Sequence, residues 1–297
     1  MQIFVNSQLI DPSDARIDVQ DAGFQHAVGL FETMGAWQGR VFRLAEHLAR
    51  MQASARALGL ADELDLPRIE TAIADTVRAN ELDRARIRVT YTPGPISLLG
   101  PEPDLRPEPT LVVIATESTE YDPTYFERGI TVAIGPASAN PMDALAGHKT
   151  LAYWGRLRAL RQAAQSGAGE AIHLNITNHL AGGAVSNLML VKGDTLHTPI
   201  ARGEEVEGAL PAPVLPGITR ATVIELAHAM GIDVKRAMLS IDDLLDADEV
   251  FLTNSSWLVL PVMHVEQETI GDGKVGAVTR RLREQLMETI VCETGGV

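Results

Sequence analysis

Segments with helical spacing of apolar residues alternate with strand-like segments along almost the whole chain, and this alternation is the strongest constraint on its fold. Apolar side chains recur at helical spacing over residues 44–58, and a further helix is predicted over 67–80. Strands are predicted over 3–10 (as a hairpin), 86–91 and 110–116. Because strands mix with helices throughout, the sequence predicts an α/β or α+β protein.

The same alternation resumes at residue 129, after a break of polar and turn-forming residues around 117–125. Helices and strands are predicted there at 129–134, 150–165, 170–176, 188–191, 216–230, 241–245, 249–252, 257–263 and 278–291. With 297 residues and a mass of 32.0 kDa, the chain is long enough for two cores. We therefore expect a small N-terminal domain over 1–118, a linker over 119–128 and a larger C-terminal domain over 129–297.

The composition excludes several classes of function. A formal charge of −14 and a pI near 5.0 argue against a nucleic-acid partner, because no basic stripe is available to neutralise phosphates. The single cysteine, Cys292, excludes an internal disulfide framework and a cysteine-built metal site. The N-terminal residues do not match a signal peptide, and no apolar run reaches the roughly 18–20 residues that cross a membrane. We expect a cytoplasmic protein without a metal or a membrane partner.

Lysine is rare in this chain, and one of its four lysines differs from the others. Lys192, Lys235 and Lys274 lie in turn-like or exposed contexts, whereas Lys149 lies just before a predicted helix. A lysine attacks a carbonyl only as the neutral amine, which requires a desolvated, partly apolar pocket that lowers its pKa. If the protein performs amine chemistry through a Schiff base, Lys149 is the predicted residue. The alternative is an ordinary solvated lysine.

Several short segments, in a fixed order, resemble those of one enzyme family. The N-terminal half contains Gly29-Leu-Phe-Glu-Thr33 and Glu46-His-Leu-Ala-Arg50. The C-terminal half contains, in order, the segments 148–153, 183–187, 215–220, 247–255 and 260–262. Together they resemble the class IV (fold type IV) pyridoxal-phosphate enzymes, which include branched-chain aminotransferases, D-amino-acid transaminases, R-selective amine transaminases and aminodeoxychorismate lyase. The resemblance covers nearly the whole chain and implies a two-domain, D-amino-acid aminotransferase-like fold.

The resemblance also implies a cofactor, a reaction and partners. The cofactor would be pyridoxal 5'-phosphate, held by Lys149 through a Schiff base. Lys149 would then shuttle the proton between the substrate Cα and the cofactor. The leading expectation is an aminotransferase that moves an amino group between an amino acid or amine and a 2-oxo acid. Family members place loops of a partner subunit in the active site, so a homodimer is expected.

Residues that would hold the cofactor phosphate follow from the same resemblance. Gly217, Ile218 and Thr219 open a predicted helix, where free backbone N–H groups and the helix dipole favour an anion. Taken locally, Thr219 is equally explained as a cap of that helix. The resemblance assigns three further residues to the phosphate, namely Arg50, Ser255 and Ser256. An arginine offers paired donors to a phosphate, although Arg50 alternatively is a solvated residue on an amphipathic helix.

Other matched residues would lie beside the cofactor ring or the substrate. Tyr153, one helical turn after Lys149, is expected near the ring oxygen, and Asn187 is a second expected cofactor contact. On the substrate side, Phe31 matches a pocket-lining aromatic of the family and His26 lies near the expected substrate. The family's carboxylate-binding arginines have no clear counterpart, and Arg88 and Arg106 are the nearby candidates. Each of these residues also has a structural explanation, in particular a core position for Phe31 and Tyr153.

The chain departs from the family at one position that bears on the chemistry. Family members usually carry a glutamate five residues before the asparagine matched by Asn187, and its carboxylate keeps the ring nitrogen protonated. Here that position is Gly182. Asn187 and His173 are the nearest polar candidates to replace the carboxylate, and the sequence assigns neither.

Three functions therefore stay open. The first is the aminotransferase. The second is aminodeoxychorismate lyase, which releases pyruvate from the same lysine-bound cofactor. The third is a repurposed or non-catalytic member of the family, because a chain that lost the carboxylate at Gly182 could keep the fold without turnover.

Overall fold

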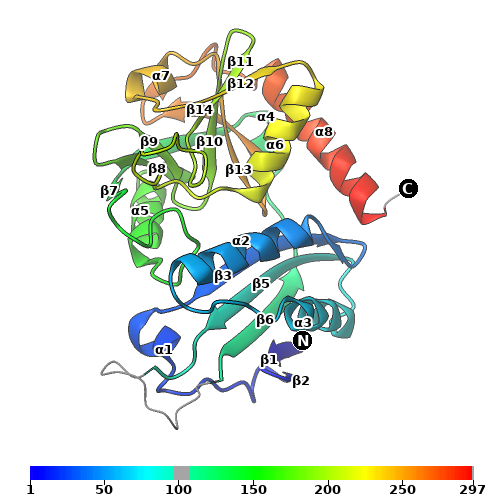
Figure 1. Ribbon diagram of the computed structural model, residues 1–297. Coiled ribbons are helices and arrows are strands. Elements are labelled where there is room, and N and C mark those ends of the chain that lie inside the picture. The colour runs from blue at the N-terminus through cyan, green and yellow to red at the C-terminus, as the bar shows by residue number, and fades with distance from the viewer. Residues whose placement is uncertain (97–107, 296–297) are drawn as a thin grey trace. The chain divides into compact units, whose positions relative to one another are not determined.

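The computed structural model describes residues 1–96 and 108–295, and the chain forms two compact units (Figure 1). The first unit consists of Met1–Thr119, Lys149–Ala152 and Ile290–Val297. The second unit consists of Glu120–His148 and Tyr153–Thr289. Because compactness does not establish independent folding, the division into domains at 1–118 and 129–297 stays a prediction.

The first unit is an antiparallel sheet with two helices packed on one face. Its elements are β1 (Ile3–Val5), β2 (Gln8–Ile10), α1 (Ala22–His26), β3 (Leu30–Trp37), β4 (Arg40–Val41), α2 (Leu44–Ala57), α3 (Leu66–Ala79), β5 (Arg84–Thr92) and β6 (Thr110–Glu117). The strand order is β2-β1-β6-β5-β3-β4. The predicted hairpin over 3–10 and the helices over 44–58 and 67–80 are confirmed as β1–β2, α2 and α3.

The core of the first unit consists of the inward-facing residues of its strands and helices. Met34 of β3 lies opposite Ile87 of β5, and both are fully buried beneath the two helices. From the helices, Leu48 and Met51 of α2 and Ile73 of α3 enter the same core. Burying a side chain of this kind contributes about 1.5–3 kcal/mol, so these contacts fix which face of each element points inward.

The second unit is a nine-stranded mixed sheet with helices packed against it. Its elements are α4 (Thr124–Glu127), β7 (Ile130–Ala139), α5 (Trp154–Gln165), β8 (Glu170–Asn175), β9 (Leu180–Gly183), β10 (Asn187–Lys192), β11 (Thr195–Pro199), α6 (Ile218–Ala229), β12 (Asp233–Ala237), α7 (Ile241–Leu245), β13 (Glu249–Asn254), β14 (Leu258–Val265), β15 (Glu268–Thr269) and α8 (Ala277–Thr294), whose last residues belong to the first unit. The strand order is β12-β11-β10-β13-β14-β7-β8-β9, with β15 on β14. The parallel pair β7–β8 is joined through α5, which packs on both strands (Figure 1).

The segment around Lys149 differs from its predicted form. The sequence predicts a helix from residue 150, but α5 begins only at Trp154. Instead, Lys149–Ala152 pairs with the edge of β3: the Phe31 N–H donates to the Lys149 carbonyl and the Leu151 N–H to the Gly29 carbonyl, both at 3.0 Å. This edge is open to pairing because β4 covers only the far end of β3, at Ala36 and Trp37. Helical spacing in the sequence could not reveal a partner strand 118 or more residues away.

One buried carboxylate joins three elements of the first unit. Asp21, 1% exposed, precedes α1 and accepts a hydrogen bond from the Gly23 N–H at 2.7 Å. Its other oxygen accepts from the hydroxyls of Thr92, at the end of β5, and Thr110, at the start of β6, both at 2.7 Å. The contact therefore caps a helix and fixes the two strand ends that flank residues 93–109.

None of the helices in the described part of the chain has the length and apolar character required to span a bilayer.

We predict that Asp21→Ala lowers the free energy of unfolding by about 2–4 kcal/mol, because it removes a helix cap and leaves buried hydroxyl donors unpaired. Urea denaturation of the purified variant measures the loss. Asp11→Ala is the matched control, because Asp11 is exposed and its carboxylate accepts from Ser13 in its own turn. Equal stability of Asp21→Ala and the native protein would contradict this account of Asp21.

Candidate functional site

In the first unit, Lys149 lies against an aromatic ring together with a second cation. The Lys149 Nζ is 4.5 Å from the centre of the Phe31 ring, and the Arg88 Cζ is 3.9 Å from the same centre. Phe31 itself is 4% exposed. The Phe31 ring gives the Lys149 amine a partly apolar neighbour, while the ring quadrupole attracts the amine when it is protonated.

A buried ionic group is built on Glu32, the residue that follows Phe31 on β3. Glu32, 1% exposed, accepts from the Arg50 Nε at 2.8 Å and Nη2 at 2.5 Å, and its Oε2 is 2.8 Å from the His47 Nδ1. Although burial acts to raise it, the charge of Arg50 and the hydrogen bond from His47 lower the pKa of Glu32 to about 2. Arg50 is therefore not the solvated surface arginine of the alternative interpretation.

His47 is held as a neutral side chain at the same place. Burial has the largest effect and lowers the pKa of His47. The contact with Glu32 opposes this effect, whereas the charges of Arg50 and Lys149 lower the pKa further. We call Phe31, Glu32, His47, Arg50, Arg88 and Lys149 the Lys149 cluster. It contains three cations and one carboxylate, so it suits a ligand that carries negative charge.

Local geometry explains how these residues converge. Adjacent residues of a strand point to opposite faces, so Phe31 and Glu32 serve different sides of β3. His47 and Arg50 are three residues apart on α2 and share the helix face that meets Glu32. Gly29 allows the Lys149 segment to approach, because a Cβ there would lie 2.6 Å from the Tyr91 carbonyl oxygen and 2.8 Å from the Leu151 Cδ1. Only glycine fits.

The remaining expected substrate-side residues have different positions. His26 is exposed and ends the short helix α1. Arg106 lies outside the described residues. Glu32 and His47 are members of the cluster that the sequence analysis did not single out. The available signal was their place inside the two motif segments, a glutamate in an otherwise apolar strand and a histidine three residues before Arg50.

In the second unit, α6 begins in a way that leaves its first N–H groups for a ligand. Its N-cap is Gly217, and no side chain of the described residues caps this end. Thr219 is the second residue of the helix and is 5% exposed, so the alternative in which Thr219 caps the helix is wrong. Uncapped N–H groups and the positive end of the dipole of this 12-residue helix favour an anion such as a phosphate.

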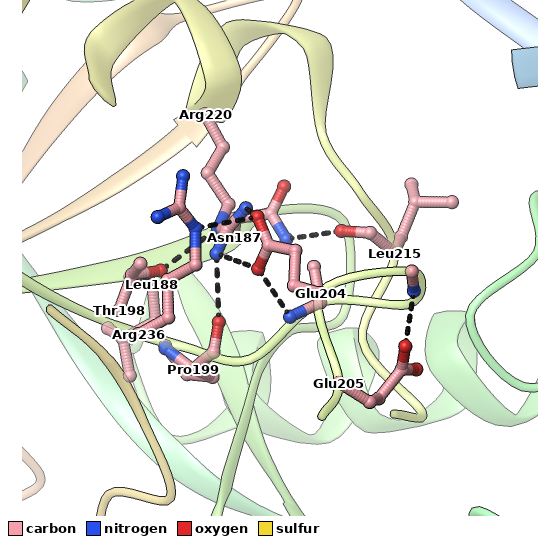
Figure 2. Close-up of polar contacts among 11 residues, drawn as sticks. Asn187, Leu188, Thr198, Pro199, Glu204, Glu205, Leu215, Arg220 and Arg236 are labelled. Atoms are coloured by element: carbon pink, nitrogen blue, oxygen red, sulfur yellow. Dashed lines mark hydrogen bonds and ion pairs between the residues drawn. The ribbon is translucent and has the colours of Figure 1, made fainter. Parts of the chain in front are cut away.

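Asn187 holds the loop that leads into α6. Its Nδ2 donates to the Leu215 carbonyl at 2.8 Å, as Figure 2 shows. A Cβ at Gly217 would overlap the Asn187 Oδ1, so the two residues fit together only with glycine at 217. Asn187 begins β10 and lies opposite Thr253 of β13. The hydroxyl of Thr253, 1% exposed, finds no hydrogen-bond partner among the described residues.

An ion pair between a buried arginine and a half-buried glutamate anchors the first turn of α6. Arg220, 2% exposed, donates from both Nη atoms to the two carboxylate oxygens of Glu204 at 2.8 Å (Figure 2). Its Nε and Nη2 also donate to the Thr198 hydroxyl and the Pro199 carbonyl, both at 3.0 Å. Although burial acts to raise it, the hydrogen bond from Arg220 helps hold the pKa of Glu204 below its ordinary value. The bond to Pro199 ties α6 to the end of β11.

The two serines assigned to the phosphate lie in the turn between β13 and β14. The side chain of Asn254 shapes this turn: its Oδ1 accepts from the Ser256 N–H at 2.9 Å and the Trp257 N–H at 3.0 Å. Its Nδ2 donates to the Val185 carbonyl at 3.2 Å. Ser255 and Ser256 are both half-buried. The turn is thus held to the β9–β10 turn by a side chain that the sequence analysis did not assign.

Tyr153 reaches the β9–β10 turn rather than sharing a helix with Lys149. It precedes α5, so the helical-spacing argument that placed it beside Lys149 is wrong. Its hydroxyl donates to the Ala184 carbonyl at 3.0 Å. The Arg156 Nη1 donates to the same carbonyl at 3.4 Å and to that of Gly183 at 3.2 Å.

Gly182, the position of the missing glutamate, has a backbone that disfavours any side chain. Its φ is +88°, and a Cβ would lie 3.0 Å from the Ser186 carbonyl oxygen. The nearby buried carboxylate belongs to Glu170 of β8, which accepts from the N–H groups of Ala184 and Val185, both at 3.1 Å, and from the Ser186 hydroxyl at 2.9 Å. Glu170 thus holds the turn itself.

The chain matches a known family over most of its length. The model of the amino-transferase class IV family covers residues 29–265. A putative branched-chain-amino-acid aminotransferase of Methanocaldococcus jannaschii is 32% identical over 289 residues, which is 97% of this chain and 96% of that protein. The D-alanine aminotransferase of Listeria innocua is 28% identical over 298 residues, 99% of this chain and 98% of that protein.

Solved structures agree with the sequence relatives. The branched-chain amino acid aminotransferase of Escherichia coli superposes with a TM-score of 0.87 at 26% identity, covering 100% of this chain and 95% of that one. The 4-amino-4-deoxychorismate lyase of Pseudomonas aeruginosa gives a TM-score of 0.81 at 26% identity, covering 96% and 98%. The chain is therefore a member of the class IV aminotransferase family, with the fold type IV architecture of pyridoxal-phosphate enzymes.

We predict that Gly217→Ala lowers the free energy of unfolding by about 1–3 kcal/mol, because the new methyl group overpacks the Asn187 side chain. The matched control is Gly155→Ala in α5, where a Cβ meets nothing within 4 Å. Helix propensity there leaves stability unchanged or raises it by up to ~1 kcal/mol. Denaturant titrations compare the two variants, and equal effects would contradict the close fit of Gly217 against Asn187.

A pH dependence follows from the pKa of Glu32, which is about 2 in the folded chain against an ordinary value of 4.5. The ionised carboxylate contributes its full stability above pH 4.5 and loses it as the pH falls from 4.5 to 2, because the unfolded chain takes up the proton first. One such proton gives a slope of at most about 1.4 kcal/mol per pH unit. Glu32→Gln should flatten the dependence of unfolding free energy on pH over this window.

Urea titrations between about pH 3 and pH 5 measure this slope. The control is Glu70→Gln, because Glu70 is an exposed residue of α3 in the same unit. An unaltered slope for Glu32→Gln would show that Glu32 is not the residue whose ionisation is coupled to folding.

Proposed function

We propose that this protein is an aminotransferase that moves an amino group from a small amino donor to a 2-oxo acid, with pyridoxal 5'-phosphate as its cofactor. The observation that carries the proposal is the Lys149 amine, which lies over the Phe31 ring in a chain of the class IV family. The named functions of the M. jannaschii and Listeria relatives support transamination rather than another reaction.

The residues present fit such a cofactor. The bound cofactor supplies an aldehyde for a lysine amine and an electron sink for the substrate, and it carries a phosphate dianion. For the phosphate, the second unit offers the uncapped α6 N-terminus and the partnerless Thr253 hydroxyl described above. For the aldehyde, the first unit offers one lysine on a partly apolar surface.

Each residue then receives a role. Lys149 would hold the cofactor covalently and, as a neutral amine, would move the proton at the substrate Cα. The residues we propose for the phosphate are Arg50, Gly217, Ile218, Thr219, Ser255 and Ser256. Tyr153 and Asn187 position the parts of the chain that contact the ring. On the substrate side we propose Phe31, Arg88 and His26, and we propose that the protein acts as a homodimer.

Aminodeoxychorismate lyase activity is the second candidate. The observation in its favour is the TM-score of 0.81 to the P. aeruginosa lyase, which covers 96% of this chain. Gly182 motivates a third candidate, a family member without turnover, because its backbone does not accommodate the usual carboxylate.

Spectroscopy with a donor panel tests the proposal. Purified protein incubated with pyridoxal 5'-phosphate should show the visible absorbance of a lysine-bound cofactor. An amino donor should bleach it, and a 2-oxo acid should restore it. Release of pyruvate from aminodeoxychorismate without any acceptor would favour the lyase instead. A protein that takes up no cofactor would favour the member without turnover.

We predict that Lys149→Ala abolishes the absorbance and lowers turnover by at least about 10³-fold, because both the covalent attachment and the proton transfer are lost. The control is Lys192→Ala, because the Lys192 side chain is 53% exposed at a turn. Steady-state kinetics with the best donor measure both variants. Undiminished turnover in Lys149→Ala would remove the assignment on which the proposed function rests.

A further inference from the structure

We infer that Glu32 and His47 are positioning residues that set the preference of this protein for a phosphate-bearing ligand by orienting Arg50. The inference rests on the proposed function, since it takes the phosphate group of a pyridoxal cofactor as the ligand. It adds two residues for which neither the motif resemblance nor the family match supplies a role.

The two hydrogen bonds between Arg50 and Glu32 fix the plane of the Arg50 guanidinium. The two carboxylate oxygens accept from Nε and Nη2 at 2.8 and 2.5 Å, which is a bidentate pairing. The Arg50 side chain is 10% exposed and that of Glu32 is 1% exposed, so water does not compete strongly for this pair. A guanidinium has five N–H donors, so one arginine can serve a carboxylate along one edge and a phosphate along another.

His47 makes this arrangement rigid from the other side. Its Nδ1 is 2.8 Å from the Glu32 Oε2, and an ionised carboxylate only accepts, so Nδ1 is the donor. Both His47 and Arg50 project from one stretch of α2, so the carboxylate is clamped between two side chains of a single helix. Neutral His47 fixes Glu32 without adding a further charge to the cluster.

The carboxylate also reduces the net positive charge that a phosphate meets, so two effects oppose each other. The orientation effect dominates in a buried pair, because removing one partner leaves the other charge without a defined position or counter-charge. Loss of Glu32 should therefore weaken phosphate recognition, although it makes the cluster more positive. The opposite sign would be expected if Arg50 acted only as a point charge.

Two aldehydes that differ only in the phosphate test the inference. The affinity of the protein for pyridoxal 5'-phosphate and for pyridoxal is measured by absorbance titration, and their ratio reports the contribution of the phosphate. We expect Glu32→Gln to lower this ratio about 10- to 100-fold, the size of a lost charge-assisted interaction. The affinity for pyridoxal itself should stay within about 2-fold. His47→Gln, a milder change, should lower the ratio less.

Two further variants separate positioning from general destabilisation. Thr76→Ala removes a buried hydrogen bond to the Ala72 carbonyl in α3 of the same unit, so it should lower stability and leave the ratio unchanged. In the Arg50→Gln background, Glu32→Gln should no longer change the ratio, because its effect passes through Arg50. This non-additivity is a readout that a purely structural role would not produce.

Each alternative outcome decides against one claim. Equal losses of affinity for both aldehydes in Glu32→Gln, or a ratio effect that persists without Arg50, would overturn the positioning role. A native protein that binds both aldehydes equally would overturn phosphate recognition by Arg50, while leaving Lys149 in place. Binding of neither aldehyde by the native protein would instead overturn the proposed function itself.

Discussion

The pairing of residues 149–151 with the open edge of β3 is the interaction on which the rest of the candidate chemistry depends. Two backbone hydrogen bonds of 3.0 Å attach the Lys149 segment to the strand that carries Phe31 and Glu32. Without these bonds, the helix would begin near residue 150, as the sequence predicts. Backbone groups at a strand edge need partners, and this segment supplies them. The absence of a Cβ at Gly29 provides the space.

Buried carboxylates organise both units in the same physical manner. Glu32 orients Arg50, Glu204 anchors Arg220 at the start of α6, and Glu170 closes the β9–β10 turn through two N–H donors and one hydroxyl. A buried charge is tolerated only when its hydrogen-bonding capacity is filled, so each carboxylate fixes the backbone or side chain that fills it. Each carboxylate therefore restricts the conformations of the functional residues near it.

The structure around Gly182 explains why the glutamate usual in the family is disfavoured at this position. Its left-handed backbone and the contact of a Cβ with the Ser186 carbonyl disfavour a glutamate there. Burial raises the pKa of Glu170, but its oxygens already accept from the turn, so Glu170 supports the turn rather than replacing the missing carboxylate. Arg156 and Tyr153 bond to carbonyls of this turn. Glu170 thus binds the N–H and hydroxyl donors of this turn, whereas Tyr153 and Arg156 bind its carbonyls.

The sequence by itself determined the element types and the family, and it singled out Lys149 as the candidate for Schiff-base chemistry. Periodicity, turn residues and motif order are local properties of the chain, so they can be recognised without a structure. The core helices α2 and α3 and the strands β5 and β6 were predictable to within a few residues for this reason. The tertiary structure alone decided that the Lys149 segment pairs with β3, that Tyr153 precedes α5, and that Glu32 binds both His47 and Arg50. Those facts depend on hydrogen bonds between residues 15 to 122 positions apart, and no local pattern records which distant partner a backbone edge or a buried charge will find.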